Sequence, residues 1–208
     1  QTICSGDSSS AFTLTSTVAG YRIIWEVSDT LNIDQVPIQK GEGNSPLVFK
    51  PMRLFNNSIQ QGYVKISATV GCTNVPKTFH TIYVNPTAKI IASPMQSFLC
   101  SGTATNINIL SSLNTGSFSW TVLAPTSITG AIAGNGNKIA QTLVNNGNKM
   151  DTVKYTISIS GVNCPGPKLD VFVIVQPPLT IKNLADFSVC SGSLIMPCLL
   201  YTSDAADE

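Results

Sequence analysis

The sequence predicts an all-β protein made of tandem immunoglobulin-like (PKD-like) β-sandwiches, and three observations support this fold class. A sequence pattern recurs at intervals of 96 and 90 residues, and apolar residues alternate with polar ones around each of two tryptophans. Segments rich in Gly and Asn separate the alternating runs, as turns do between strands. No window shows a convincing helical stripe of apolar residues. A unit of about 90 residues with about seven short strands suits an immunoglobulin-like sandwich.

Each repeat opens with an apolar-Cys-Ser-Gly tetrapeptide, which occurs three times. Both complete copies then carry a tryptophan, a tyrosine nine residues before a second cysteine, and a β-rich run that ends in proline. The three opening cysteines are Cys4, Cys100 and Cys190. The later features are Trp25, Tyr63, Cys72 and 82–86 in the first copy, and Trp120, Tyr155, Cys164 and 173–177 in the second. We therefore expect repeat 1 at 1–88, repeat 2 at 89–180 and the start of a third repeat at 181–197.

The elements of each repeat follow in a fixed order. An early strand lies at 12–15 or 107–109, and a tryptophan strand follows in which alternate residues are apolar. Gly/Asn turns come next at 41–44 and 134–137. The shared phase around the tryptophans places Trp25 and Trp120 on buried strand faces, so we expect both, with Tyr63 and Tyr155, to anchor the cores.

The tyrosine strands do not match in phase. After Tyr63 the apolar residues fall on the opposite parity from the tyrosine, whereas around Tyr155 they share its parity. Because a shift of one residue exchanges the two faces of a strand, a bulge or a one-residue slip in one copy would reconcile them.

The six cysteines admit three interpretations. The repeat favours bonds within each unit, Cys4 with Cys72 and Cys100 with Cys164, while Cys190 begins a unit whose partner lies further on. A bond from Cys72 to Cys100 across the repeat boundary is an alternative, and free buried thiols are another. Disulfides would imply an oxidising, extracellular compartment.

Composition excludes several classes of partner. Charged residues make up 11% of the chain, the formal net charge is +1 and the mean hydropathy is +0.20. No cluster of Lys or Arg favours nucleic acid or an anionic membrane. The longest apolar runs have the length of a strand, so no membrane insertion is expected. The chain opens without a signal-peptide pattern, as an internal fragment or a mature chain would.

No catalytic, cofactor-binding or metal-binding motif occurs. His80 is the only histidine, and we expect a half-buried position in the closing strand, in register with Val171. The carboxylates are few and scattered, which disfavours a Ca²⁺ site or a glycosidase pair. Asn56-Asn57-Ser58 is formally a glycosylation sequon.

The last segment, 198–208, reads Cys-Leu-Leu-Tyr-Thr-Ser-Asp-Ala-Ala-Asp-Glu. It resembles a translated sequencing adapter along its whole length. We therefore expect an artefact of a gene recovered from shotgun reads, and assign this segment no function.

With these residues in hand, the repeat resembles the PKD-like domains that recur in giant surface proteins and adhesins of Bacteroidota. The resemblance rests on the Cys-Ser-Gly opening, the strand tryptophan, the Gly/Asn loop leading to Gln141-Thr142-Leu143, the tyrosine strand, the late cysteine and the closing proline run. Repeat 1 departs at 45–49, where the Gln-Thr-Leu element is missing. The family implies export, a role as spacer or adhesive module, and no catalytic residues.

These observations lead to one main hypothesis and one alternative. The chain is expected to be a non-catalytic structural or adhesive module of a large secreted or cell-surface protein. Its expected partners are neighbouring repeats of the same chain and, further, surface glycans or proteins. The alternative is an accessory region, carbohydrate-binding in one version, of a secreted multidomain hydrolase.

Overall fold

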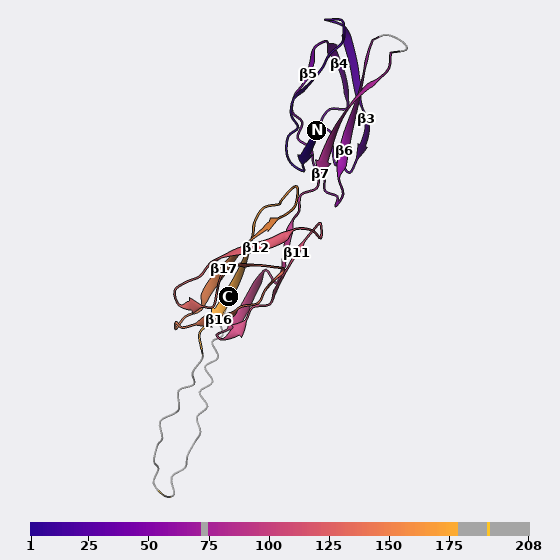
Figure 1. The fold of residues 1–208 in the computed structure, drawn as a ribbon. Helices are drawn as coiled ribbons and strands as arrows, with labels where there is room; N and C mark the ends of the chain where they lie inside the picture. Colours follow the sequence, from indigo (N-terminus) through magenta and orange to yellow (C-terminus); the bar gives the residue numbers. More distant parts are fainter. Residues whose placement is uncertain (72–74, 179–190, 192–208) are drawn as a thin grey trace. The chain divides into compact units, whose positions relative to one another are not determined.

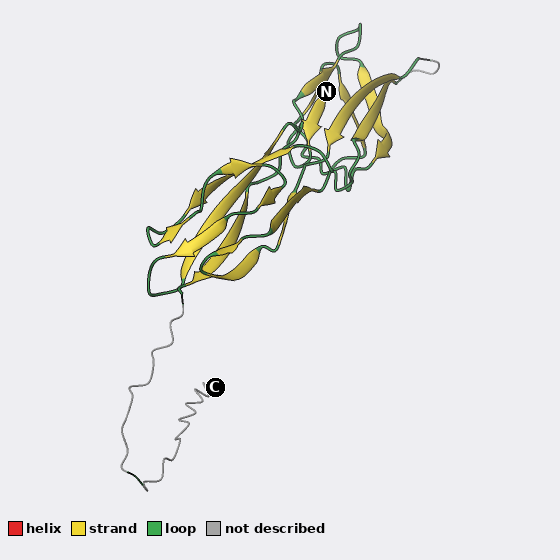
Figure 2. Ribbon diagram, turned by 60° about the horizontal axis from the view of Figure 1, so that its bottom comes forward, coloured by secondary structure: helices red, strands yellow, loops and turns green. Residues whose placement is uncertain are grey.

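The computed structural model describes residues 1–71, 75–178 and 191, and this part of the chain is built from strands without a helix. Residues 1–178 form one compact unit. They contain two separate hydrophobic cores, one drawn from residues 3–84 and the other from residues 90–175. Figures 1 and 2 show the strands grouped around these two cores. The predicted all-β, immunoglobulin-like fold class is confirmed.

The described residues of repeat 1 form seven strands. Five of them form one sheet in the order β1-β7-β6-β3-β4, and the two others pair with each other on the opposite side of the core. The opening strand β1 runs parallel to the closing strand β7, whereas the other pairs are antiparallel. The strands are β1 (Thr2–Cys4), β2 (Phe12–Leu14), β3 (Arg22–Leu31), β4 (Lys40–Asn44), β5 (Leu47–Phe49), β6 (Gly62–Val70) and β7 (Thr78–Asn85).

Repeat 2 has the same five-stranded sheet, in the order β9-β18-β17-β12-β14, again with its opening and closing strands parallel. Its other strands form two three-stranded sheets, β15-β11-β8 and β10-β16-β13. The strands are β8 (Ile90–Ser93), β9 (Gln96–Cys100), β10 (Thr103–Ala104), β11 (Ile107–Ser111), β12 (Ser117–Leu123), β13 (Ile128–Thr129), β14 (Gly134–Asn135), β15 (Lys138–Ile139), β16 (Thr142–Asn145), β17 (Asp151–Ser160) and β18 (Leu169–Gln176).

The two tryptophans occupy matching places in their cores. Trp25 is 9% exposed and pairs across the sheet with Gly41, and Trp120 is 6% exposed and pairs with Gly134. A Cβ atom on either glycine would lie 2.8 Å from the Cζ2 atom of the tryptophan, closer than two carbons approach without a shift. Glycine is therefore the residue that lets each indole lie against the neighbouring strand.

The tyrosines do not match. Counted from the end of each closing strand, the residue that corresponds to buried Tyr155 is Ile66, because Ile66 pairs with His80 and Tyr155 pairs with Val171. Tyr63 lies on the other face of β6, half-exposed, and donates a hydrogen bond to Asp29 Oδ2 at 2.7 Å. The expectation that Tyr63 anchors the core is thus wrong.

A β-bulge does occur in repeat 1, but on β3. The register between β3 and β6 shifts between Val27 and Asp29, whereas the corresponding β12–β17 pairing in repeat 2 is regular. The two tyrosines therefore do not occupy equivalent positions, although each lies nine residues before a cysteine in the sequence.

Candidate functional site at the opening turn and the repeat junction

The Cys-Ser-Gly tetrapeptide forms the same turn in both repeats. The serine amide donates to the last residue of the closing strand, Ser5 to Asn85 O at 2.8 Å and Ser101 to Gln176 O at 3.1 Å. The glycine that follows has a positive φ, 89° at Gly6 and 85° at Gly102, a backbone conformation that glycine adopts at little cost. The turn therefore fixes the opening cysteine beside the end of the closing strand.

A buried asparagine holds this turn against the closing strand. The backbone N–H of Asn56 donates to Ser5 Oγ at 2.9 Å, and the backbone N–H of Asn145 donates to Ser101 Oγ at 3.0 Å. Each side chain then donates twice from Nδ2, in repeat 1 to Gln60 O and Val84 O, both at 2.8 Å. Sequence reasoning missed this pair, because Asn56 lies 52 residues after Cys4 whereas Asn145, the last residue of β16, lies 45 residues after Cys100.

The same geometry removes the sequon hypothesis. Asn56 is 3% exposed, and both hydrogens of its Nδ2 are engaged by backbone carbonyls. Attachment of a glycan at Asn56 would break both hydrogen bonds, so the folded repeat leaves this nitrogen unavailable.

The Gln-Thr-Leu element that repeat 1 was expected to lack has a structural counterpart at 52–54. Met52 exchanges hydrogen bonds with Ser9, and Gln141 exchanges the same two with Thr105. The turn glycine likewise donates to Leu54 O in repeat 1 and to Leu143 O in repeat 2, both at 2.8 Å. The element is therefore present in repeat 1 with a different sequence.

A disulfide joins the two repeats. It links Cys4 to Cys164, which are 160 residues apart in the sequence and have their Cα atoms 5.5 Å apart. Cys100 is a free and exposed thiol, and Cys72, Cys190 and Cys198 lie outside the described residues. The expected pairing within repeats is thereby corrected for Cys4, Cys100 and Cys164.

Strand direction explains why the pairing within a repeat fails. Cys100 lies opposite Gln176, at the end of β18, whereas Cys164 precedes the start of the same strand at Leu169. Seven residue steps along a strand span roughly 23 Å, whereas disulfide-bonded Cα atoms lie within about 7 Å. The parallel pairing of opening and closing strands, which the sequence pattern did not reveal, puts the two cysteines at opposite ends of the repeat.

The loop that carries Cys164 also forms backbone hydrogen bonds with the segment between the repeats. The Ala88 amide donates to Cys164 O and its carbonyl accepts from the Gly166 amide, both at 2.9 Å, so that Ala88 forms a parallel bridge with Pro165. Ala88 is fully buried, and a Cβ on Gly166 would lie 2.3 Å from Ala88 O. The junction is thus held by a covalent bond, two backbone hydrogen bonds and a glycine that permits their close approach.

Two other residues named in the sequence analysis, His80 and Tyr155, pack against neighbouring side chains inside their repeats. His80 is half-buried in β7 and stacks on Phe12 with ring centroids 4.0 Å apart, and burial lowers the pKa of its imidazole. Tyr155 is fully buried and donates to Gln141 Oε1 at 3.0 Å, and burial raises its pKa to about 12.

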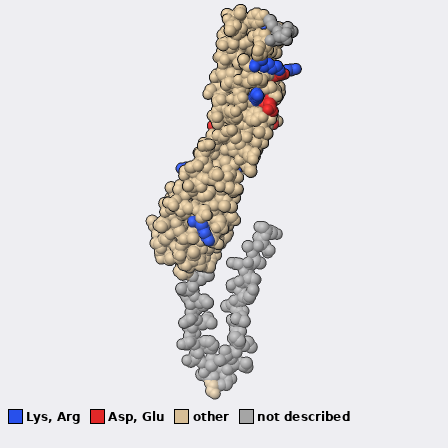
Figure 3. Space-filling view, turned by 45° about the vertical axis from the view of Figure 1, so that its right-hand side comes forward, with Lys and Arg blue, Asp and Glu red and all other residues tan. Residues whose placement is uncertain are grey.

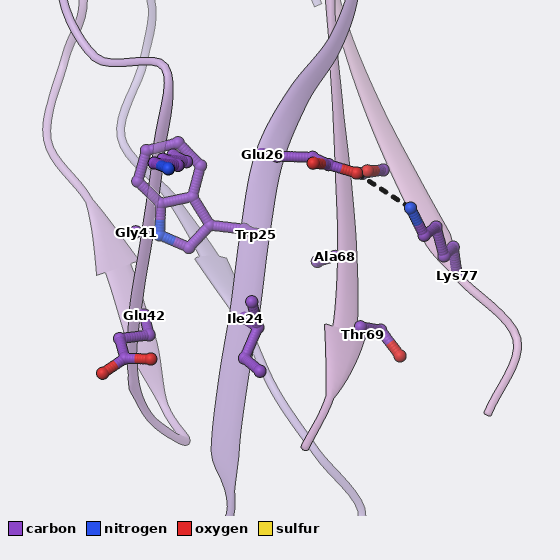
Figure 4. A pocket seen from close by; sticks show the side chains of 10 residues that line it. Ile24, Trp25, Glu26, Gly41, Glu42, Ala68, Thr69 and Lys77 are labelled. Carbon is purple, nitrogen blue, oxygen red and sulfur yellow. Dashed lines mark hydrogen bonds and ion pairs between the residues drawn. The ribbon is translucent and has the colours of Figure 1, made fainter. Parts of the chain in front are cut away.

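A shallow groove of about 510 Å³ lies over β3, β4 and β6 of repeat 1 (Figure 4). Figure 4 shows the Glu26–Lys77 ion pair across one side, at 2.8 Å, and this pair lowers the pKa of the Glu26 carboxyl. Ile24 is 41% exposed here, while Trp25 packs toward Gly41 and presents little surface. Because the groove is open to solvent and its ion pair is more than half exposed, it offers weak anchoring for a ligand.

Charged side chains are sparse on the face shown in Figure 3, where lysine, arginine and acidic residues gather in small groups. Within residues 1–71, 75–178 and 191, no three His, Cys, Asp or Glu side chains are grouped so that they could hold a metal ion. The same residues contain no helix of a length and apolarity that would span a membrane.

One part of the chain matches a known protein family. Residues 97–178 match the PKD-like domain family, a range that begins in β9 and ends after the closing strand β18. No curated protein sequence matches the chain.

The solved structures that resemble the chain include two cadherin-23 fragments and a DIP-gamma fragment. Mouse cadherin-23 EC22-24 has a TM-score of 0.40 at 11% identity, with 85% of this chain and 62% of that chain covered. Human CDH23 EC21-23 has a TM-score of 0.43 at 14% identity, covering 86% and 72%. DIP-gamma IG1+IG2 has a TM-score of 0.36 at 7% identity, covering 86% and 93%. The chain thus spans less than two thirds of the mouse cadherin-23 fragment.

Proposed function

We propose that the chain is a non-catalytic structural and adhesive repeat module of a large secreted or cell-surface protein, in which consecutive repeats are covalently joined. The observation that carries this proposal is the Cys4–Cys164 disulfide between repeats. Disulfides persist in oxidising compartments outside the cytosol, which supports an extracellular location. The PKD-like match of residues 97–178 supports the same class of module.

The junction supports a spacer role in particular. A flexible connection would leave the linking residue solvated, whereas Ala88 is fully buried and hydrogen-bonded on both sides by the 164–166 loop. The partners we propose are the neighbouring repeats, together with surface glycans or proteins bound elsewhere along the full protein. The alternative, a carbohydrate-binding accessory region, gains no support from Trp25 and Trp120, whose rings lie in the cores.

The proposal is tested on residues 1–178 with a pair of spin labels, one in each repeat, and a distance measurement between them. The intact protein should give a narrow distance distribution, and the Cys4→Ser/Cys164→Ser variant a broader one. Both proteins should keep their tryptophan fluorescence, because each repeat has its own core.

Cys100→Ser is the matched control, since it removes a thiol that is free in this unit. It should leave the distance distribution unchanged. Equal distributions with and without the Cys4–Cys164 bond would contradict the structural role, and reduced cysteines after export would contradict the extracellular location.

A further inference from the structure

Cys100 is an exposed free thiol in a unit whose other described cysteines are bonded to each other. An unpaired cysteine in a secreted protein suggests either a disulfide to a partner outside the unit or a free reactive thiol. By itself a lone thiol would indicate nothing more specific. The second observation is that Cys100 has the same surroundings as Cys4, which is bonded to the next repeat.

The equivalence of the two cysteines holds at each contact of the opening turn. Cys4 ends β1 opposite Asn85, and Cys100 ends β9 opposite Gln176, in both cases the residue before the closing proline. The following serine donates to that same residue in both repeats. The same serine also accepts the amide of the buried asparagine.

The second cysteine of the disulfide also recurs in the sequence. Cys164 lies between β17 and β18, and Cys72 falls at the corresponding point of the sequence, between β6 and β7. A third Cys-Ser-Gly opening begins at Cys190, 90 residues after Cys100. Both complete repeats therefore carry one opening cysteine and one late cysteine, and the observed bond joins the opening cysteine of repeat 1 to the late cysteine of repeat 2.

We propose that this pairing is the rule of the array: Cys100 forms a disulfide with the late cysteine of the repeat that follows repeat 2. By the same rule, Cys72 is left for the opening cysteine of a repeat before repeat 1. The inference rests on the proposed function, because it requires an exported array of such repeats. It makes the array a chain of overlapping covalent links, with one bond at each junction.

The bond forms by thiol–disulfide exchange with a low-molecular-weight disulfide such as oxidised glutathione. The thiols of Cys100 and the late cysteine each lose a proton, and their sulfurs together lose two electrons to form one S–S bond. The small disulfide gains the two electrons and the two protons and leaves as two thiols.

The test is a three-repeat protein in which residues 1–176 are followed by a second copy of residues 86–178. The second junction then has the same linker and the same late-cysteine loop as the first, and differs in the preceding repeat, which supplies Cys100 in place of Cys4. After refolding with oxidised and reduced glutathione, free thiols are alkylated and the disulfides are mapped by mass spectrometry without reduction.

We expect two disulfides, Cys4 with the first Cys164 and Cys100 with the Cys164 of the added copy. Alkylation of Cys100 should be nearly complete in residues 1–178 and nearly absent in the three-repeat protein. The Cys100→Ser variant of that protein should lose only the second bond and leave the added Cys164 open to alkylation.

The outcomes separate the two proposals. If Cys4–Cys164 forms while Cys100 stays alkylated or bonds to Cys72, the pairing rule is overturned and the proposed function stands. If Cys4–Cys164 itself does not form, the covalent junction of the proposed function is overturned as well.

Discussion

Repeats 1 and 2 share the backbone contacts that set the ends of the sandwich, but they fill its middle differently. The opening turn, the buried asparagine and the tryptophan–glycine contact recur with nearly the same distances. In contrast, the core residue two positions before the tryptophan's partner on the tyrosine strand differs between the repeats. It is Ile66 on β6 in repeat 1 and Tyr155 on β17 in repeat 2. The comparison indicates that the fold is specified by backbone hydrogen bonding at its ends and tolerates exchange of apolar side chains in its core.

The bulge in β3 is a second difference between the middle parts of the two repeats. Repeat 1 inserts an irregularity between Val27 and Asp29, and beyond it Tyr63 lies outward and bonds to Asp29. Repeat 2 keeps a regular ladder over the same stretch. The bulge lies between β3 and β6 inside the sheet, and the opening turn of repeat 1 keeps the hydrogen bonds that it shares with repeat 2.

The largest effect should come from the buried asparagine. Asn145→Ala leaves the buried Val175 carbonyl without its donor and removes the bonds to Lys149 O and from the Gly147 amide. We expect a loss of about 3 kcal/mol in the free energy of unfolding of repeat 2. Urea denaturation followed by Trp120 fluorescence, in a Trp25→Phe background, measures it.

Asn56→Ala is the matched test in repeat 1, where the same bonds go to Gln60 O and Val84 O. A similar loss of unfolding free energy in both repeats would show that the buried asparagine has the same structural role in each. A loss in one repeat alone would break the comparison.

The tryptophan–glycine contact should give the next largest effect. Gly41→Ala and Gly134→Ala each place a methyl group 2.8 Å from the Cζ2 atom of the facing indole. We expect each to lower the free energy of unfolding of its own repeat by about 2 kcal/mol, with a shift in tryptophan emission. Gly71→Ala, whose Cβ would have no neighbour closer than 4.0 Å, is the control and should change little.

Alkaline pH should distinguish the repeats. Burial raises the pKa of Tyr155 to about 12, above its value of 10.0 when unfolded, so the unfolded chain releases this proton first as pH rises. The stability of repeat 2 should therefore be constant below pH 10 and fall by roughly 2 kcal/mol toward pH 12.

Equilibrium denaturation across this pH range, with each repeat followed by its own tryptophan, measures the difference. Tyr155→Phe should remove most of the decline in repeat 2. A decline of the same size in the Tyr155→Phe protein would assign it to another group.

The smallest effect concerns the two tyrosine hydroxyls at neutral pH. Tyr155→Phe removes a buried hydrogen bond to Gln141 Oε1 and should cost about 1 kcal/mol. Tyr63→Phe removes a bond to Asp29 on the exposed face and should change the stability by less than about 0.5 kcal/mol. Thermal denaturation of the two variants side by side measures the contrast, and equal losses would contradict the different placements of the two residues.

Periodicity in the sequence was sufficient to predict the fold class and the burial of both tryptophans, because alternation reports directly which face of a strand is apolar. It was insufficient for Tyr63, because the tyrosine's spacing from Cys72 resembled that of Tyr155 from Cys164 while the strand register differed. The position of Met52-Arg53-Leu54 was also missed, because its contacts are made by the backbone and leave no residue signature.

The cysteines of the candidate site were predictable from the sequence, but their pairing and the other residues of the junction were not. The repeated Cys-Ser-Gly pattern identified the cysteines, but their pairing depends on β1 running parallel to β7, which no short-range pattern encodes. The junction depends on Ala88 and Gly166, which are small residues with an unremarkable sequence context. Long-range strand direction, more than local propensity, separates the expected pairing from the observed one.

The Cys4–Cys164 bond also bears on how the chain would respond to a pulling force. A load applied before Cys4 and after Cys164 passes directly through the S–S bond, so the 160-residue span that it closes carries no load. That span would otherwise extend by on the order of 550 Å. In single-molecule stretching, we expect this length to be released only after a reductant has cut the bond. With the bond intact, the residues between Cys4 and Cys164 should not extend under load.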